Sequence, residues 1–351
     1  MKLVLVTFGC FLIFVTFLSL SRSPRWWIRV TDFPRLQIAV CLAAVLLCYA
    51  LLYGFDGGGN GVFLAAVAGA LGYQGFRIFP YTILAPCQTK KAAKARPDAS
   101  IRLLISNVLM ENRRADAFLA LVREAGPDLV LAVETDAWWG EQLKALDRDY
   151  PHSVKQPQGN YYGMHLFSKL ELESPEVRFL VEKDVPSVRT AVRLRSGDWI
   201  DFFGVHPQPP VPHEDTEERD AEILIVAKEV RADDRPAIVA GDLNDVAWSH
   251  TTRLFQRVSG TLDPRRGRGM FSTFHTRYPF FRWPLDHIFH EASFTLVRLQ
   301  RLRSIGSDHF PVLAELHYEP GAAKRQEAPE ADHADRKEAC EKVAEGKETA
   351  S

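Results

Sequence analysis

The sequence predicts an α/β (α+β) fold, a four-layer sandwich of two β-sheets flanked by helices, preceded by transmembrane helices at the N-terminus. Two observations predict it. Between residues 100 and 318, short apolar and β-branched runs alternate with amphipathic stretches, a mixture typical of packed sheets covered by helices. The first 90 residues are far more apolar than the rest, although the 351-residue chain is only 46% hydrophobic overall. The length fits one large domain plus an appendage.

Three apolar runs open the chain, and each is long enough to cross the roughly 30 Å hydrocarbon core of a bilayer as a helix. Helices are expected at residues 3–21, 36–55 and 61–84. The first run is too long for a signal-peptide core and lacks a good cleavage site, which favours an uncleaved anchor over a secretory signal. A pair of buried helices in a soluble protein is disfavoured for the other two, because neither has a polar stripe. Residues 1–87 are therefore expected to be a membrane anchor.

Basic residues flank these runs asymmetrically. The loop between the second and third runs has no Lys or Arg. The segment between the first and second runs is basic, with Arg22, Arg25, Arg29 and Arg35. The segment after the third run is basic as well, with Lys90, Lys91, Lys94 and Arg96. By the positive-inside rule both basic segments lie in the cytoplasm. The sequence thus predicts an integral membrane protein whose large C-terminal domain is cytoplasmic.

Two segments are expected to lie outside the main fold. Residues 88–99 have the composition of a charged linker, and residues 319–351 that of a disordered, charged tail rich in Ala, Glu and Lys, without the apolar residues to build a core. The net charge of −1 argues against a whole-molecule basic field of the kind that drives non-specific nucleic-acid binding. None of the cysteines forms a metal-binding pattern in the main domain.

Within the main domain, the periodicity of apolar residues predicts the elements in order. Strands are expected at 101–105, 128–133, 188–194, 199–205, 237–240, 285–289, 294–299 and 312–316, and helices at 115–124 and 216–231. The turn Ser196-Gly197-Asp198 makes 188–194 and 199–205 a hairpin.

Polar residues with catalytic potential follow these strands. Asp242 and Asn244 come just after the strand 237–240, and side chains two residues apart can face the same side. Such a pair suits a cation and a phosphate oxygen, although an ordinary Asx turn is the alternative. Asp286 lies in a strongly apolar strand, where an ionised carboxylate needs a partner. His309, beside Asp308, is the expected partner, and a purely structural Asp–His pair remains the alternative.

Six short motifs occur in a fixed order over about two-thirds of the chain: Ser106-Asn107-Val108, Leu131-Ala132-Val133-Glu134, Val205-His206-Pro207, Gly241-Asp242-Leu243-Asn244, Leu285-Asp286-His287 and Ser307-Asp308-His309. The series resembles the motif set of the endonuclease/exonuclease/phosphatase family, whose members are deoxyribonuclease-I-like, and the apolar N-terminus looks like that of a membrane-anchored bacterial-type member of the inner membrane. Val133 departs from the Gln that many members have before the glutamate, which leaves the subfamily open.

The resemblance implies a role for each motif residue. Glu134 would be the principal metal ligand, with Asn107 nearby, and Asp308 would help to bind or orient the metal's coordination shell. Such oxygen ligands favour Mg²⁺ or Mn²⁺. The implied catalytic residues are His206, Asp242, Asn244, Asp286 and His309. Asp242 would help to activate water, and Asn244 and His206 would bind the phosphate. His309, oriented by Asp286, would transfer a proton or stabilise the phosphoryl oxygens.

The implied reaction is metal-assisted, in-line attack of water on a phosphate ester. The motifs do not choose between nucleic acid, phospholipid and small phosphodiester substrates, and the lipid bilayer is a further expected partner through the N-terminal helices. A catalytically silent, membrane-bound interaction module is the alternative function. Because no motif precedes Asn107, removing residues 1–96 is expected to leave a soluble, folded hydrolase.

Three further features have competing interpretations. Arg189 could face the phosphate, but a surface salt bridge is favoured. Tyr162, in a Gly-rich segment, could line the substrate groove, although a packed aromatic beside a turn is favoured. The aromatic and basic stretch 265–283 directly precedes Asp286, and could contact substrate, face the membrane or fold onto the core.

Overall fold

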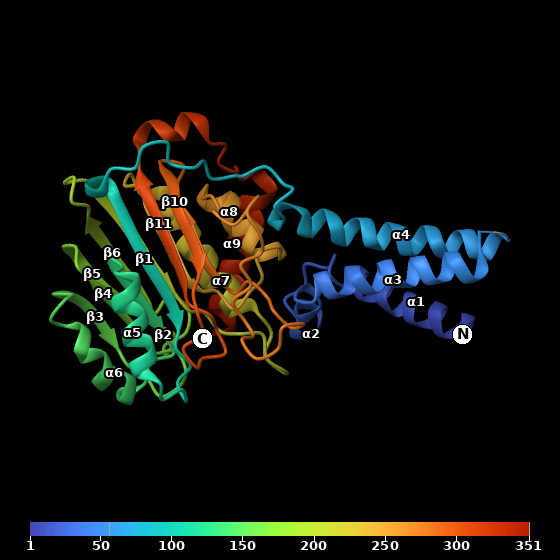
Figure 1. Ribbon diagram of the computed structural model, residues 1–351, viewed down its shortest axis with the longest axis horizontal. Coiled ribbons are helices and arrows are strands. Elements are labelled where there is room, and N and C mark those ends of the chain that lie inside the picture. Colours follow the sequence, from blue (N-terminus) through green and yellow to red (C-terminus); the bar gives the residue numbers. More distant parts are fainter. Residues whose placement is uncertain (56, 351) are drawn as a thin grey trace.

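The computed structural model describes residues 1–55 and 57–350. A globular part contains two β-sheets, and three N-terminal helices project together from one side of it (Figure 1). The chain therefore has the two-part organisation that the apolar N-terminus predicts.

The first sheet has six strands in the order β10-β11-β1-β2-β4-β3. Its neighbours pair antiparallel except β1 and β2, which are parallel. The strands are β1 (Ser100–Asn107), β2 (Leu129–Val133), β3 (His152–Gln156), β4 (Met164–Ser168), β10 (Phe294–Arg301) and β11 (Val312–Tyr318).

The second sheet has five strands in the order β5-β6-β7-β8-β9, with only β7 and β8 parallel. The strands are β5 (Leu172–Arg178), β6 (Ser187–Arg193), β7 (Trp199–Val205), β8 (Ala237–Asp242) and β9 (Asp286–His290). The expected hairpin at 188–194 and 199–205 is confirmed as β6 and β7.

The two sheets pack face to face, and helices cover their outer faces. Inward-facing residues such as Leu131, Phe202 and Ile238 form the core between the sheets. Helices α5 (Ala115–Ala125) and α6 (Ala137–Leu143) pack on the outer face of the first sheet. Helices α7 (Glu217–Ala232), α8 (His250–Ser259) and α9 (His333–Thr349) lie on the second. The predicted four-layer sandwich is confirmed.

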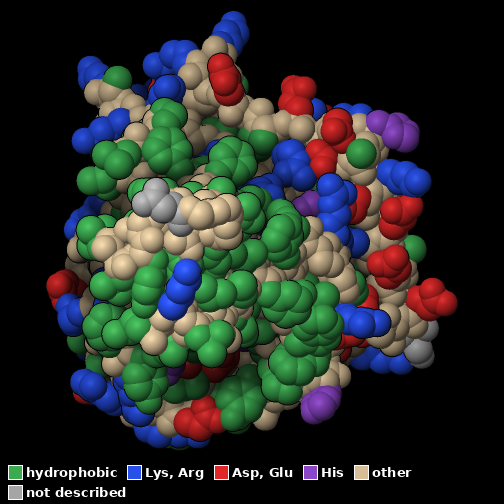
Figure 2. Space-filling model, turned by 90° about the vertical axis from the view of Figure 1, so that its right-hand side faces the viewer, with side chains coloured by type: hydrophobic (Ala, Val, Ile, Leu, Met, Phe, Trp, Pro, Cys, Tyr) green, Lys and Arg blue, Asp and Glu red, His purple; other side chains and the backbone are tan. Residues whose placement is uncertain are grey.

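The projecting helices are α1 (Lys2–Leu18), α3 (Arg35–Tyr53) and α4 (Gly58–Ile78), which the 3₁₀ helix η2 (Phe79–Tyr81) extends. By length and composition, α3, with 19 residues, and the 24-residue stretch Gly58–Tyr81 can span a membrane, whereas α1 is a shorter apolar helix of 17 residues. Figure 2 shows hydrophobic side chains covering this part of the surface, with Lys and Arg gathered around it.

A short segment joins α1 to α3 and lies against the globular part. It contains α2 (Trp26–Arg29) and the 3₁₀ helix η1 (Val30–Asp32). Phe33 of this segment and Tyr81 after α4 pack in one buried cluster with Val246, Trp248 and Leu285 of the domain. The helices are thus docked on the domain at their domain-side ends.

The segments expected to be a linker and a disordered tail differ from that expectation. In residues 88–99, Thr89 is fully buried and hydrogen-bonded to His290, and the amide of Ala92 donates to Leu296. In 319–351, the 3₁₀ helix η5 (Pro320–Arg325) and α9 are ordered, and only Ser351 lies outside the described residues. Composition misleads here because α9 adds only a few apolar residues, such as Ala339 and Val343, to the domain, together with polar contacts such as Lys342 with Asp220.

Candidate active site

The predicted site residues come together where the strands of both sheets end. Asn107 ends β1 and lies beside Val133, the last residue of β2, which Glu134 follows. In the other sheet, Asp242 at the end of β8 pairs with Asp286 at the start of β9. Because the two sheets pack face to face, the ends of β1 and β2 lie opposite the end of β8 and the start of β9. Residues far apart in the sequence therefore share one site.

Asn107 connects the carboxylates of the two sheets. Its Nδ2 donates to Oε1 of Glu134 at 2.7 Å and to Oδ2 of Asp242 at 3.1 Å. Its Oδ1 accepts from the amide of Leu109 at 3.0 Å, which fixes the orientation of the carboxamide. Burial raises the pKa of Glu134 to about 7, against the opposing effect of the Asn107 hydrogen bond. The ionised form of Glu134 therefore needs a positive charge beside it.

His309 lies between two buried carboxylates. Its Nδ1 donates to Oδ2 of Asp286 at 2.8 Å, and its Nε2 lies 3.5 Å from Oδ2 of Asp242. Burial lowers the pKa of His309, but Asp286 and Asp242 outweigh it and raise the pKa to about 10. The imidazole is therefore protonated at neutral pH, with one N–H towards each carboxylate. The partner expected for Asp286 is present.

Asp242 is fully buried, yet its pKa lies below the usual range. Burial acts to raise it, but His309 and His206, with hydrogen bonds from the amide of Asn244 and from Asn107, lower it. The amide bond from Asn244 measures 2.9 Å. The carboxylate is thus ionised at neutral pH and can accept a proton from water.

His206 and Asn244 complete the second-sheet side of the site. His206 is buried, its Nδ1 has no hydrogen-bond partner, and burial lowers its pKa to about 4, so the ring is neutral. Nδ2 of Asn244 donates to the carbonyl of Pro207 at 2.9 Å. Asp308 is half-buried, and its charge acts on both Glu134 and His309.

The backbone is strained at this site. Glu134 and Asn244 adopt left-handed conformations, with φ of 61° and 51°, which non-glycine residues rarely occupy. Only glycine fits at position 241, where φ is 151°, because a Cβ there would lie 1.8 Å from the carbonyl oxygen of Val205. Such conformations persist only where surrounding contacts enforce them, and they gather at functional sites.

The donors fit a divalent cation. Asp242, Asp286 and His309 can each offer a ligand atom, and these atoms lie within 4.8 Å of one another. His309 is a poor ligand there, because both of its nitrogens carry protons when the pKa is about 10. Glu134 is the better candidate, since burial disfavours its ionised form more than Asn107 and the charge of His309 favour it, and oxygen donors of this kind favour Mg²⁺ or Mn²⁺.

Arg219 is a residue that the sequence reasoning missed. It is buried on α7, donates to the carbonyl of Asn244 at 3.1 Å and pairs with Asp220 at 2.9 Å. It also lies 3.8 Å from Asp245. Arg219 therefore fixes the backbone of the Asp242–Asn244 turn through the carbonyl of Asn244. No motif marks it, because a charged residue in a helix usually faces solvent.

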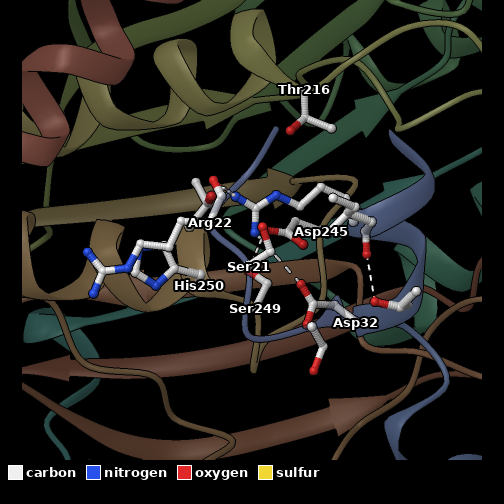
Figure 3. A network of polar contacts seen from close by, with 12 residues as sticks. Ser21, Arg22, Asp32, Thr216, Asp245, Ser249 and His250 are labelled. Carbon is white, nitrogen blue, oxygen red and sulfur yellow. Dashed lines mark hydrogen bonds and ion pairs between the residues drawn. The ribbon is translucent and has the colours of Figure 1, made fainter. Parts of the chain in front are cut away.

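Asp245 belongs to a polar network that reaches the N-terminal segment (Figure 3). Oδ2 of Asp245 accepts from Ser249 and from Thr252. Figure 3 draws Ser21, Arg22 and Asp32 of the segment between α1 and α3 near Ser249 and His250 of the domain, and Arg22 and His250 both contact Glu338. Thr216 donates to the carbonyl of Pro24 at 3.0 Å. The segment between α1 and α3 thus contacts the elements that hold the Asn244 turn.

The three features with competing interpretations, Arg189, Tyr162 and the stretch 265–283, each make specific contacts in the structure. Arg189 pairs with Asp233 at 2.8 Å, as favoured. The ring of Tyr162 lies 5.8 Å from that of His206, so this tyrosine does border the site. In the aromatic stretch, the ring of Phe274 lies 5.0 Å from that of His309, and the amide of Thr276 donates to the carbonyl of Asp308. The stretch therefore packs against the last motif.

Residues 104–309, more than half of the chain, match the sequence profile of the endonuclease/exonuclease/phosphatase family. The chain belongs to this family, whose members typically hydrolyse phosphoester bonds and generally depend on a divalent metal. No curated protein sequence matches the chain.

Solved structures share the fold. The structure of D. rerio TDP2 complexed with a single-strand DNA product matches with a TM-score of 0.53 and 17% identity, over 63% of this chain and 100% of that one. The human Nocturnin catalytic domain with bound sulfate matches with a TM-score of 0.53 and 15% identity, over 68% and 99%. A family protein from Bacteroides vulgatus matches with a TM-score of 0.51 and 18% identity, over 63% and 99%. At these identities the likeness shows the fold alone.

Proposed function

We propose that this protein is a divalent-metal-dependent hydrolase of phosphate esters that its N-terminal helices hold at a membrane. The observation that carries the proposal is the buried line Asp286–His309–Asp242 beside Glu134. A protonated imidazole between two carboxylates, at strained strand ends, perturbs the pKa values of several groups together, which is typical of functional sites.

Glu134 would hold the metal, with Asn107 orienting its carboxylate and Asp308 adding negative charge nearby. A bound Mg²⁺ or Mn²⁺ supplies Lewis-acid polarisation of the phosphate and neutralises negative charge on the leaving oxygen. Every other part of the chemistry belongs to side chains of this chain.

Asp242, ionised and held by the amide of Asn244, accepts the proton of the attacking water. His309 is protonated and so acts as a cation that donates to the phosphoryl oxygens as their charge grows, while Asp286 holds its other nitrogen. His206 is neutral and buried with a free Nδ1, which suits a hydrogen bond to the same phosphate. Asn244 offers its carboxamide on that side.

The charge around the mouth of the site bears on the substrate. Glu182, Asp184 and Glu214 lie close enough to act on Tyr162, which borders His206. Burial, together with Glu218, Asp184 and Glu214, raises the pKa of Glu182 to about 7. Acids here repel the many phosphates of a nucleic acid, which such proteins usually bind through Lys and Arg. A phospholipid head group or a small phosphodiester is therefore proposed over the DNA of D. rerio TDP2.

The helices support the membrane part of the proposal. Along α1, α3 and α4 many large apolar side chains are exposed, such as Phe11, Leu51 and Val62. Only 22% of the most apolar window is buried in α3, and the same share in α4 with η2. A core helix of a soluble protein would hide these side chains.

The test is hydrolysis by the purified full chain of single-stranded DNA, phospholipid vesicles and a soluble model phosphodiester, each with Mg²⁺, with Mn²⁺ and with excess chelator. We expect metal-dependent release of product from the phosphodiester and from phospholipid, and much less from DNA. Activity that persists in excess chelator would contradict the metal mechanism. Absence of hydrolysis from all three would favour the silent interaction module.

A further inference from the structure

A cavity of about 890 Å³ lies between the start of α3 and the loop that leads to Asp286. One wall is the first two turns of α3, including Leu36 and Val40. The opposite wall is the loop from Arg268 to Arg282, and a third side is the end of β10. The volume falls within the range of small-molecule sites, roughly 300–1,000 Å³.

The apolar wall of this cavity is continuous with the apolar surface of the helices. Val40 is 61% exposed and Phe280 is 83% exposed, and Nε2 of Gln37 donates to the carbonyl of Phe280 at 2.6 Å. This contact fixes the loop tip at the level where α3 begins. If α3 spans a bilayer, the cavity opens at the membrane surface, beside the hydrocarbon that covers the helix.

Three guanidinium groups line the polar side of the cavity, from Arg268, Arg282 and Arg301. Among the described residues none of the three forms a salt bridge to a carboxylate. Arg301 donates to the carbonyl of Ser272, and Arg282 to those of His275 and Thr276. Backbone carbonyls leave the positive charges uncompensated, in contrast to the neighbouring Arg265, which pairs with Asp263.

Arg282 and Arg301 lie together. Their guanidinium carbons are 5.0 Å and 4.6 Å from the centre of the same ring, that of Phe310. Partial burial, with the charge of Arg282, lowers the pKa of Arg301. Two adjacent cations at the edge of an apolar cavity match an anionic group with a hydrocarbon tail, because guanidinium groups bind phosphate through paired hydrogen bonds.

We propose that this cavity binds one anionic membrane phospholipid. Its phosphate would lie on Arg282 and Arg301, with Arg268 nearby, and an acyl chain would lie against Leu36, Val40 and Phe280. The proposal rests on the membrane anchorage proposed above, but not on the hydrolytic activity. None of the residues that line the cavity is one of the candidate active-site residues. The lipid site is therefore separate from the site of hydrolysis.

The experiment is native mass spectrometry of the full chain in a mild neutral detergent, titrated with phosphatidylglycerol and, separately, with zwitterionic phosphatidylcholine. We expect one phosphatidylglycerol to bind, at least tenfold more tightly than phosphatidylcholine. The double variant Arg282→Gln/Arg301→Gln should lose roughly tenfold or more in affinity for phosphatidylglycerol, because each loses a charge-assisted bond to phosphate. The matched control is Arg298→Gln/Arg303→Gln, two exposed arginines near the same strand, which should bind as the wild type does.

A second pair of variants tests the acyl chain. Val40→Trp fills the cavity and should abolish tight binding, whereas Leu47→Trp, on the exposed side of the same helix and outside the cavity, should not. Equal affinity of the wild type for the two lipids, or unchanged binding by either the arginine or the Val40 variant, would overturn the proposal. Metal-dependent hydrolysis of a soluble phosphodiester, measured on the same samples, reports separately on the hydrolase.

Discussion

At the scale of single residues, the imidazole of His309 has the most closely defined surroundings. Asp286 binds its Nδ1, and Asp242 lies at its Nε2. Oδ1 of Asp286 has no hydrogen-bond partner, so Asp286 interacts mainly with this histidine. The role that we propose for Asp286 is therefore to orient and charge the ring, so substitutions of the two residues should cause related losses of activity.

We expect His309→Ala to lower turnover by roughly 10²–10³-fold, the usual effect of losing a donor positioned at the developing charge of the transition state. The metal requirement should change little, because Glu134 is untouched. Asp286→Asn should show a smaller defect of the same kind, since the ring remains but loses the carboxylate that raises its pKa. The measurement is the rate of hydrolysis of a model phosphodiester against Mg²⁺ concentration. Variants with wild-type rates would refute these assignments.

Glu134→Gln tests the metal site directly. The substitution keeps the shape and can still accept from Asn107, but it removes the charge that would hold a cation. We expect activity to fall steeply and to recover in part as Mg²⁺ or Mn²⁺ is raised. A rate that is equally low at every metal concentration would instead indicate that Glu134 takes part in another step. Titration of Mg²⁺ against rate distinguishes the two outcomes.

How far the sequence could predict this site depends on where each residue's partners lie. Six motifs in order located Glu134, Asp242 and His309, because each stands at a strand end and the family resemblance carries its role. Arg219 could not be found in this way, since its contact with the carbonyl of Asn244 depends on how α7 packs. The border position of Tyr162 beside His206 likewise depends on tertiary structure.

At the scale of elements, α9 shows the limits of composition. Its few apolar side chains predict disorder, yet Ala339 is fully buried, and Lys342 reaches Asp220 at 2.8 Å. Glu338 contacts both His250 and Arg22, at 2.5 Å and 2.9 Å. A helix held by charge pairs and a few small apolar contacts has no hydrophobic pattern that predicts it. The eight expected strands, whose apolar residues alternate or run together, lie nearly at their observed bounds, whereas β3, β4 and β5 were not predicted.

Lys342→Ala should therefore destabilise the fold. Asp220 keeps Arg219 as a partner but loses a buried charge-assisted hydrogen bond, so we expect a loss of about 1–3 kcal/mol in the free energy of unfolding. Lys337→Ala, on an exposed lysine of the same helix, is the control and should change stability by less than about 0.5 kcal/mol. Thermal unfolding of the two variants and the wild type is the measurement. Equal changes in stability for Lys342→Ala and Lys337→Ala would show that the contact of Lys342 with Asp220 does not stabilise the fold.

Asp220 also gives this network a pH dependence. Burial would raise its pKa, but Lys342, Arg219 and Arg29 outweigh burial and hold it below the usual range. A depressed folded-state pKa stabilises the fold above the ordinary value of about 3.9 and loses that contribution as the pH falls below it. The stability gap between the wild type and Asp220→Asn should therefore be largest near neutral pH and narrow below about pH 4. A gap independent of pH would contradict the ion-pair account.

At the scale of the whole molecule, the domain lies at one end of the projecting helices (Figure 1). That end also carries the segment with Arg22, Arg25 and Arg29, whereas the described residues of the loop between α3 and α4 contain no Lys or Arg. The positive-inside rule assigns the basic end to the cytoplasm. A fluorescent reporter fused at the C-terminus should therefore be active, and an alkaline phosphatase fused there inactive. The reverse pattern would place the catalytic domain outside.

The docking of the anchor changes what truncation is expected to do. Nε1 of Trp248 donates to the carbonyl of Asp32 at 2.7 Å, and the hydroxyl of Tyr81 donates to the carbonyl of Ala247 at 2.6 Å. Trp248 and Ala247 follow the Asp242–Asn244 turn directly and are both buried. The anchor is thus part of the packing behind the active site, a dependence that the position of the motifs along the chain does not reveal.

Removing residues 1–96 should for this reason destabilise the remaining domain, in contrast to what the sequence alone predicts. The deletion exposes the cluster that contains Val246, Trp248 and Leu285 and removes the partner of His290, so we expect aggregation and a lower unfolding temperature. A deletion of residues 1–18 alone, which removes only α1 and keeps Asp32, Phe33 and Tyr81, is the matched control and should retain activity in detergent. Both fragments and the full chain are compared by thermal unfolding, size-exclusion chromatography and metal-dependent hydrolysis. A monomeric fragment 97–351 with the full chain's unfolding temperature and turnover would show that the anchor contacts do not stabilise the site.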